Sequence, residues 1–213
     1  MRKQTFDAVL DIPAGRIHLV AADRTDATVE ILPADPATSR DVQAAERLAV
    51  TRADGVLRIE AAKPANRLLG SPGAVEVTVQ LPAGSRVQAK VAAGELRGAG
   101  RLGDVTVDSA QGSIELEEAG SAQLTLQAGD IVVGRLTGSA QLSTQKGDLR
   151  VAEAVAPEGS LTLRTQDGDI TVGARTASLD ASTAYGRIDN SLTGSGLTIH
   201  ATTSRGDITA RGI

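Results

Sequence analysis

Hydrophobic and polar residues alternate through the second half of the chain, and glycines interrupt the alternation at regular intervals. Around Gly129, for example, apolar side chains stand seven and five positions before the glycine, at Ala122 and Leu124. They return two and four positions after it, at Ile131 and Val133. A period of two is typical of a strand with one buried face. Each repeat therefore predicts two short strands joined at a glycine turn.

The glycines that mark the repeats are each followed by a polar residue and then by Ile or Leu. They are Gly94, Gly112, Gly129, Gly147, Gly168, Gly186 and Gly206. Successive members lie 18, 17, 18, 21, 18 and 20 residues apart. A nearly constant period of this length is typical of solenoids, in which each repeat forms one coil. We interpret the seven glycines as structural turn residues.

Every repeat matches its immediate neighbour column for column. A hairpin array would instead match every second repeat, because adjacent strands would run in opposite directions. Equivalent strands stacked in parallel, about 4.8 Å apart, explain the match. The sequence therefore predicts an all-β fold, a parallel β-solenoid with coils of about 18 residues. A right-handed β-helix is favoured because parallel crossovers are overwhelmingly right-handed.

The first part of the chain follows the repeat less closely, so we divide the sequence after residue 72. Residues 1–72 are interpreted as irregular β-rich coils or a cap, and residues 73–213 as regular solenoid repeats. A cap is expected because a solenoid must shield the open strand edges at its ends.

Three local patterns lie in the predicted cap. Residues 40–48 carry apolar side chains about three apart, which predicts one short helix. Asp54-Gly55 separates two β-prone runs and predicts a hairpin. Residues 63–73 are rich in Gly and Pro, which predicts a loop and the boundary between the cap and the regular repeats.

Composition agrees with a thin solenoid and narrows the class of partner. Only Phe6 and Tyr185 are aromatic, there is no Trp, and 23 residues are Gly, which suits a narrow interior. A formal net charge of −4 with scattered basic residues gives no electrostatic footprint for nucleic acid. Without Cys, the chain has neither disulfides nor thiolate metal sites.

The N-terminal residues and the hydropathy bear on location. Basic residues near Met1 are not followed by the apolar segment of a secretory signal. No stretch approaches the roughly 18 apolar residues of a membrane-spanning helix. The sequence predicts no membrane insertion, and a cytoplasmic protein if Met1 is the native start.

The residue after the repeat glycine is acidic in several repeats, most regularly at Asp130, Asp148 and Asp169. In a parallel stack these carboxylates form a column of like charges, and two charges about 4 Å apart cost roughly 1 kcal/mol in bulk water. We expect carboxylates that bond to nearby backbone N–H groups; Ca²⁺ bridging and a catalytic acid pair are the alternatives. The nonapeptide of Ca²⁺-binding toxin repeats is absent, so the three aspartates are weak Ca²⁺ candidates.

Two further columns depend on the order in which the repeats stack. Arg187 takes the acidic position in its repeat, so we expect it to lie between Asp169 and Asp207 and to pair with both. Three positions before the glycine, four repeats carry Thr, which predicts a structural column of hydroxyl groups. These residues are Thr144, Thr165, Thr183 and Thr203.

The sequence gives no constellation for catalysis or for a cofactor. His18 and His200 are far apart in the sequence, and His200 stands between two inward positions, so both are predicted at the surface. No nucleophile elbow, Walker A or dinucleotide-binding motif occurs. We therefore predict no enzyme activity, no catalytic residue and no cofactor.

The chain ends in a regular repeat, Ile208-Thr209-Ala210-Arg211-Gly212-Ile213, with no cap after it. An uncovered parallel strand edge is a template for another copy, which predicts a homo-oligomer through the C-terminal coil. Tyr185, at a turn, is the aromatic residue that could anchor a protein partner, whose identity the sequence does not give.

Two stretches and the repeated phrase carry a family resemblance. They are residues 73–85, GAVEVTVQLPAGS, residues 10–15, LDIPAG, and the recurring Gly-Asp-Ile or Gly-Asp-Leu. With these features the chain resembles the bacterial β-strand-repeat family catalogued as domain of unknown function 4097 and labelled "putative adhesins". The resemblance spans nearly the whole chain and implies a β-helix-like fold. It supplies no activity and no catalytic residue.

These observations favour a non-enzymatic structural or protein-interaction module that self-associates end to end. The alternative is an adhesin-like or carbohydrate-binding surface module, which would require export.

Overall fold

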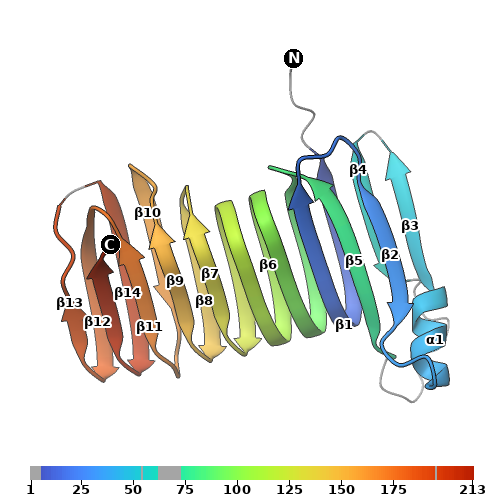
Figure 1. The fold of residues 1–213 in the computed structure, drawn as a ribbon. Coiled ribbons are helices and arrows are strands. Elements are labelled where there is room, and N and C mark those ends of the chain that lie inside the picture. The colour runs from blue at the N-terminus through green and yellow to red at the C-terminus, as the bar shows by residue number, and fades with distance from the viewer. Residues whose placement is uncertain (1–5, 54, 62–72, 195) are drawn as a thin grey trace.

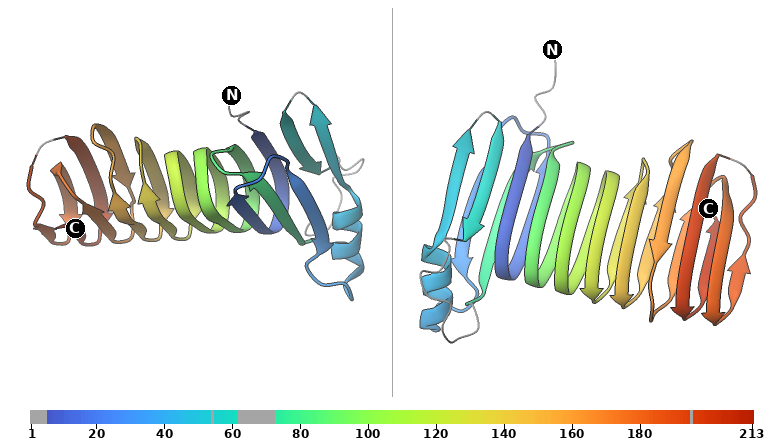
Figure 2. Two further views of the ribbon diagram at one scale, coloured as in Figure 1. Left: turned by 45° about the horizontal axis from the view of Figure 1, so that its top comes forward. Right: turned by 180° about the vertical axis from the view of Figure 1, so that it is seen from behind.

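The chain winds into one elongated solenoid with a small helical element at its N-terminal end (Figures 1 and 2). The computed structural model describes all residues except 1–5, 54, 62–72 and 195. The first elements are β1 (Asp7–Ala22), β2 (Thr28–Pro33), α1 (Ser39–Glu46), β3 (Leu48–Ala53), β4 (Val56–Ala61), β5 (Val75–Pro82), β6 (Arg86–Ala128) and β7 (Ile131–Leu136). The remaining elements are β8 (Ala140–Lys146), β9 (Leu149–Ala154), β10 (Gly159–Arg164), β11 (Ile170–Ala174), β12 (Ala177–Tyr185), β13 (Ile188–Asn190), β14 (Leu197–Arg205) and β15 (Ile208–Gly212).

Each regular coil contributes one strand to each of two walls. We call the wall that contains β8, β10, β14 and β12 wall 1, and the wall that contains β7, β9, β11, β15 and β13 wall 2. The long β6 winds through both walls, pairing with β8 in wall 1 and with β7 in wall 2. All these pairs are parallel and in register, with Leu142 beside Leu124 on one strand and Leu163 on the other. The predicted parallel β-solenoid with two short strands per coil is confirmed.

The interior between the two walls is narrow and is filled by aliphatic side chains. Alternate strand residues point inward, so that Leu124, Leu142, Leu163 and their equivalents are buried, while the residues between them face solvent. One continuous cluster of buried apolar residues extends from Ala8 to Ala210. Because neighbouring coils lie about 4.8 Å apart, each inward side chain packs against its equivalents above and below. The narrow interior has little room for large rings, which explains why the chain carries almost no aromatic residues.

The coils do not follow the chain order at the C-terminal end. Strand β14 pairs with β10 on one edge and with β12 on the other, and β15 likewise lies between β11 and β13. The last coil in the sequence is therefore the second from the end in space. The expectation that the C-terminal coil forms the exposed end is wrong. A terminal segment with a hydrogen-bonded neighbour on both edges resists the fraying that chain ends otherwise show.

The same arrangement occurs at the N-terminal end. Strand β1 pairs with β6 on one edge, and with β4 and β5 on the other. Residues 7–22 therefore form a regular coil inside the stack, although the sequence placed them in the irregular cap before residue 73. The division after residue 72 does not follow the strand pairing. Most of the expected boundary loop, 63–73, lies outside the described residues.

A small antiparallel unit covers the N-terminal end of the stack. Strand β2 runs antiparallel to β5, and β3 runs antiparallel to β4. The predicted helix is α1, which lies beside β2 (Figure 1). Ala53 pairs with Val56 across the predicted hairpin, so the two strands on either side of Asp54-Gly55 are antiparallel as expected. In the described part of the chain, no helix has the length and hydropathy needed to cross a bilayer.

Candidate interaction surfaces

The repeat glycines stack in a column at one corner of the solenoid. At Gly147, φ is +139°, and a Cβ atom would lie 2.1 Å from the carbonyl oxygen of Gly129 in the neighbouring coil. Such contacts recur along the column, which continues from Gly168 to Gly206 and from there to Gly186. The backbone of one coil thus rests on the next, and a side chain has no room. The column explains the glycine period.

Gly15 also belongs to this column, which the sequence reasoning missed. A Cβ atom on Gly94 would lie 1.9 Å from the carbonyl oxygen of Gly15. The signal was present, because Gly15-Arg16-Ile17 has the same form as the repeat phrase Gly186-Arg187-Ile188.

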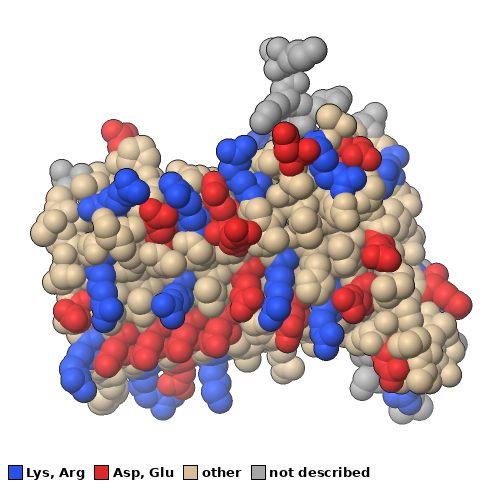
Figure 3. Space-filling view, viewed as in Figure 1, with Lys and Arg blue, Asp and Glu red and all other residues tan. Residues whose placement is uncertain are grey.

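The aspartates after the glycines form a ladder of hydrogen bonds between coils. Asp130 Oδ1 accepts the backbone N–H of Asp148 at 2.8 Å, and Asp148 Oδ1 accepts that of Asp169 at 2.8 Å. Asp169 and Asp207 continue the ladder at the same distance. Figure 3 shows the acidic side chains in a row across the coils. One carboxylate oxygen per residue is therefore engaged by the backbone, which offsets the repulsion between like charges.

The expected position of Arg187 is wrong, because the coils interleave. Asp207 lies next to Asp169, and Arg187 lies beyond Asp207 at the end of the column. The backbone N–H of Arg187 donates to Asp207 Oδ1 at 2.8 Å. Arg187 ends the ladder and does not interrupt it.

Calcium binding by Asp130, Asp148 and Asp169 stays a prediction. Their carboxylates are exposed and each makes a backbone hydrogen bond. Within the described residues, no group of three or more His, Cys, Asp or Glu side chains is arranged to hold a metal ion.

The threonine column lies inside the same corner and supports the glycine column. Thr144, Thr165, Thr183 and Thr203 each donate a hydroxyl hydrogen bond to the carbonyl oxygen of a glycine in the adjacent coil, at 3.0 to 3.2 Å. Three of them are buried, at 5% exposure or less. The column is structural, as expected, but its hydroxyl groups bond to backbone carbonyls and not to one another.

Wall 1 presents an outward surface in which neutral polar residues predominate. The middle coils contribute Ser121, Gln123, Thr125, Ser139, Gln141, Ser143, Ser160 and Thr162. We call this surface the polar face. The sequence reasoning did not single it out, although these residues occupy the alternate positions between the inward aliphatic side chains.

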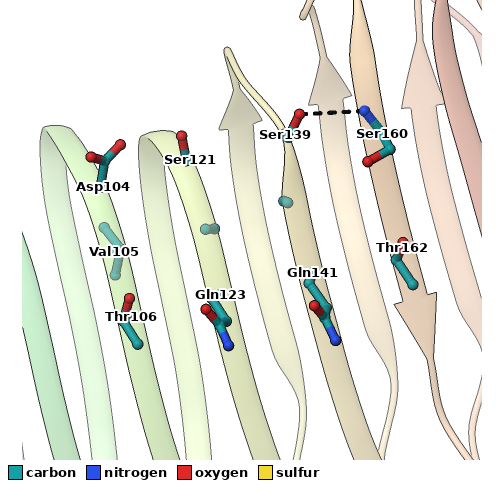
Figure 4. Close-up of a pocket in the computed structure, with 11 residues that line it drawn as sticks. Asp104, Val105, Thr106, Ser121, Gln123, Ser139, Gln141, Ser160 and Thr162 are labelled. Atoms are coloured by element: carbon teal, nitrogen blue, oxygen red, sulfur yellow. Dashed lines mark hydrogen bonds between the residues drawn. The ribbon is translucent and has the colours of Figure 1, made fainter.

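The polar face contains a shallow hollow of about 350 Å³. Figure 4 shows its outward side chains from four adjacent coils, with Gln123 and Gln141 side by side. Ser139 Oγ accepts the backbone N–H of Ser160 at 3.3 Å. The hollow therefore offers amide and hydroxyl groups to a ligand, and its charged residue is Asp104 at one end.

A second hollow of about 370 Å³ adjoins the first along the polar face and shares Thr162 with it. We call it the Arg164 hollow. Its lining residues are Thr162, Arg164, Asp180, Ser182, His200 and Thr202. His200 Nδ1 lies 3.3 Å from Asp180 Oδ2. His200 is at the surface as predicted. Asp180 and His200 are in register on β12 and β14, and the interleaved order of the last coils also places His200 beside Thr162 of β10.

The C-terminal end of the stack is uncovered. Among the described strands, β12 and β13 each have a partner on one edge only, namely β14 and β15. Ile188 on β13 is 46% exposed, whereas its equivalent Ile208 on β15 is fully buried. Tyr185 is 77% exposed at the same end. The open end therefore consists of residues 177–190 and not of the C-terminal coil.

Comparison with known proteins finds a matching family and solved structures of similar fold. The family model described as Toastrack DUF4097 matches residues 8–212. A search among curated proteins finds no match. Among solved structures, a "putative adhesin" from Bacteroides fragilis is 15% identical, with a TM-score of 0.65 over 98% of this chain and 93% of that one. At this identity the similarity shows the fold alone.

Two further solved structures, both from Parabacteroides distasonis, are less similar in shape. One is a "putative adhesin", 13% identical with a TM-score of 0.45 over 96% of this chain and 92% of that chain. The other is a "putative lipid binding protein", 12% identical with a TM-score of 0.49 over 95% and 92%.

Proposed function

The chain belongs to the Toastrack DUF4097 family, and from this premise we propose that it is a non-enzymatic interaction module that self-associates end to end. The observation that carries the proposal is the uncovered coil formed by β12 and β13. The opposite end of the stack is covered by β2 and β3, which add antiparallel strands to β5 and β4. Among the described strands, β2 and β3 also have one partner each, but they run antiparallel to the stack and α1 lies beside β2. The β12 edge instead continues the parallel register of the regular coils, which leaves a template for a further strand there.

The residues of the last coil support association at this end. Leu179 and Ala181 on β12 point into the interior between the two walls. They are only half-buried because, among the described residues, no further coil lies beyond them. Their equivalents on β14, Ile199 and Ala201, are buried. A second copy placed on this end would bury Leu179, Ala181 and Ile188, and burial of apolar surface is the main favourable term in protein association.

The two edge strands contribute unequally. Strand β13 has three residues and is flanked by Arg187, so it has the short, charged character of protected edges. Strand β12 has nine residues, and its charged residue is Asp180. We assign the main pairing to β12, with Ile188 and Tyr185 packing beside it.

Sedimentation velocity over a concentration series tests this proposal. The wild-type protein is expected to shift from monomer to dimer as its concentration rises, because the dimer buries the open end. Ile188→Lys places a charge on that end and is expected to weaken the dimer by about tenfold or more, since an unpaired charge would be buried.

Val20→Lys is the matched control. Val20 is 37% exposed on the outward side of β1, far from β12 and β13 in the stack. This variant makes the same chemical change and is expected to associate like the wild type. A wild-type protein that stays monomeric at the highest concentration contradicts end-to-end association.

The polar face favours a second candidate function, an adhesin-like module that binds carbohydrate. Its hollows are lined with hydroxyl, amide, guanidinium and imidazole groups, which donate to and accept from sugar hydroxyl groups. The shared Thr162 makes the two hollows continuous along the solenoid. A polysaccharide lying along wall 1 fits a surface of this shape.

A further inference from the structure

Arg164 is the exposed arginine that lines the second hollow of the polar face. On wall 1, Arg86 pairs with Asp104 on the neighbouring coil, and Arg58 pairs with Glu60. No ion pair of the described residues includes Arg164. Its strand neighbours in register are Ser143 on β8 and Thr202 on β14, which are neutral. The guanidinium therefore keeps its donors for an external acceptor, and its planar shape matches a carboxylate.

His200 supplies an oriented hydrogen-bonding group in the same hollow. Its Nδ1 lies 3.3 Å from Asp180 Oδ2, so Nδ1 is the donor of that contact. In neutral imidazole the other ring nitrogen, Nε2, is then an acceptor. A hydroxyl group of a ligand can donate to it. His200 engages one oxygen of the Asp180 carboxylate, whose side chain is 81% exposed, so water screens its charge from an anionic ligand.

Hydroxyl groups complete the lining of the Arg164 hollow. Thr162 stands beside His200 on the neighbouring strand, and Thr202 stands beside Arg164. Ser182 follows on β12, in register with Thr202. The set combines one carboxylate-binding group with several partners for hydroxyl groups. A sugar acid is the class of molecule that carries both kinds of group on one ring.

The adjoining surface suits neutral sugar units. From Asp104 to Ser178 the polar face crosses six coils, five spacings of about 4.8 Å, or roughly 24 Å. In each of these coils, one outward residue directly precedes the inward residue of wall 1 that is equivalent to Ala122. The outward residue is Asp104 in the first coil and carries a hydroxyl group in every later coil. The residues with hydroxyl groups are Ser121, Ser139, Ser160, Thr198 and Ser178. An extended polysaccharide can therefore lie across the coils with hydroxyl partners at each step.

We infer that the Arg164 hollow binds a hexuronate unit of an acidic polysaccharide, with the carboxylate on Arg164 and ring hydroxyl groups on His200 and the neighbouring threonines. This inference rests on the second proposed function, carbohydrate binding by the polar face. The formal net charge of −4 repels polyanions in general. Binding therefore depends on this local site and not on the overall charge of the protein.

Calorimetry with polygalacturonate and with its methyl ester tests the inference. The ester keeps the sugar ring and removes the charge of the carboxylate. At about 0.15 M salt, the acid is expected to bind at least about tenfold more tightly than the ester, because the charge-assisted hydrogen bonds to Arg164 are lost with the ester. Arg164→Gln is expected to remove this difference.

Arg150→Gln is the matched control, because Arg150 is exposed on the outward side of wall 2 and makes the same change in net charge. Its binding is expected to equal that of the wild type. Equal binding of acid and ester, or equal effects of the two arginine variants, overturns the hexuronate site and leaves carbohydrate binding in place. Absence of binding to polygalacturonate, its ester and neutral dextran overturns both. Unchanged melting curves establish that the variants are folded.

Discussion

At the scale of single residues, the corner of the solenoid is fixed by the absence of a side chain. Each repeat glycine lies against the carbonyl oxygen of the glycine in the next coil. A Cβ atom added to it would be too close to that oxygen. The threonine hydroxyl and the aspartate carboxylate then use the backbone groups that this close approach brings within reach. The glycine, threonine and aspartate columns therefore depend on one another, because only glycine allows the coils to approach closely enough for the hydrogen bonds to form.

Gly147→Ala is expected to destabilise the protein by at least about 3 kcal/mol. The new Cβ atom would lie 2.1 Å from the carbonyl oxygen of Gly129, and φ is +139°, so the coil must separate from its neighbour. Chemical denaturation measures the free energy of unfolding. Gly84→Ala is the control, since φ is +83° there but no atom lies within 4 Å of the added Cβ. That variant is expected to lose only about 1–2 kcal/mol, and equal losses would contradict the steric argument.

At the scale of the element, strands are held in register by contacts between equivalent residues. The parallel ladders of both walls pair each inward aliphatic side chain with its equivalent, as Ile131, Leu149 and Ile170 do in wall 2. Outside the core, ion pairs also join neighbouring coils. Glu153 lies between Arg135 and Arg175, at 3.3 and 3.5 Å. These exposed pairs add little stability, so the register depends on the buried columns.

Thr165→Val tests the buried hydroxyl column. Thr165 donates to the carbonyl oxygen of Gly147 at 3.0 Å and is 5% exposed, and valine keeps its shape but removes the hydroxyl group. We expect a loss of about 1 kcal/mol in the free energy of unfolding. Thr125→Val makes the same change at an exposed position of β6 and is expected to be nearly neutral. Equal effects would show that the hydrogen bond to the glycine carbonyl contributes nothing.

At the scale of the whole molecule, both terminal segments are held inside the stack. The first coil, β1, and the last coil, β14 with β15, each have a parallel neighbour on both edges. The outermost coil of the C-terminal end therefore depends on a coil that follows it in the sequence. The stability of β12 and β13 is coupled to the end of the chain.

Removal of residues 197–213 tests this coupling. Strands β12 and β13 would lose the β14 and β15 partners that hold them, so residues 177–190 are expected to lose their protection from hydrogen exchange. Exchange measured by mass spectrometry reports this segment directly. Removal of Ile213 alone is the control, since Ile213 lies beyond β15 and is 57% exposed. Retained protection at residues 177–190 in the longer truncation would show that β12 and β13 do not depend on β14 and β15.

The sequence by itself determined the solenoid, because the physical causes of the coil are local and repeated. The period-two alternation fixes which side of each strand is buried, and the steric demand at the corner fixes the glycine spacing. The match between adjacent repeats fixes the parallel direction. The same reasoning identified the columns at Asp130 and Thr165, because their members occupy equivalent positions.

Only the tertiary structure decided the order of the coils. Any two equivalent coils pair equally well through the same register, so the repeat pattern does not distinguish a neighbour in the chain from a neighbour in space. The placement of β14 between β10 and β12 moved the open end to residues 177–190, set Arg187 at the end of its column and brought His200 beside Thr162. The candidate surfaces follow from this order, whereas the fold follows from the repeat.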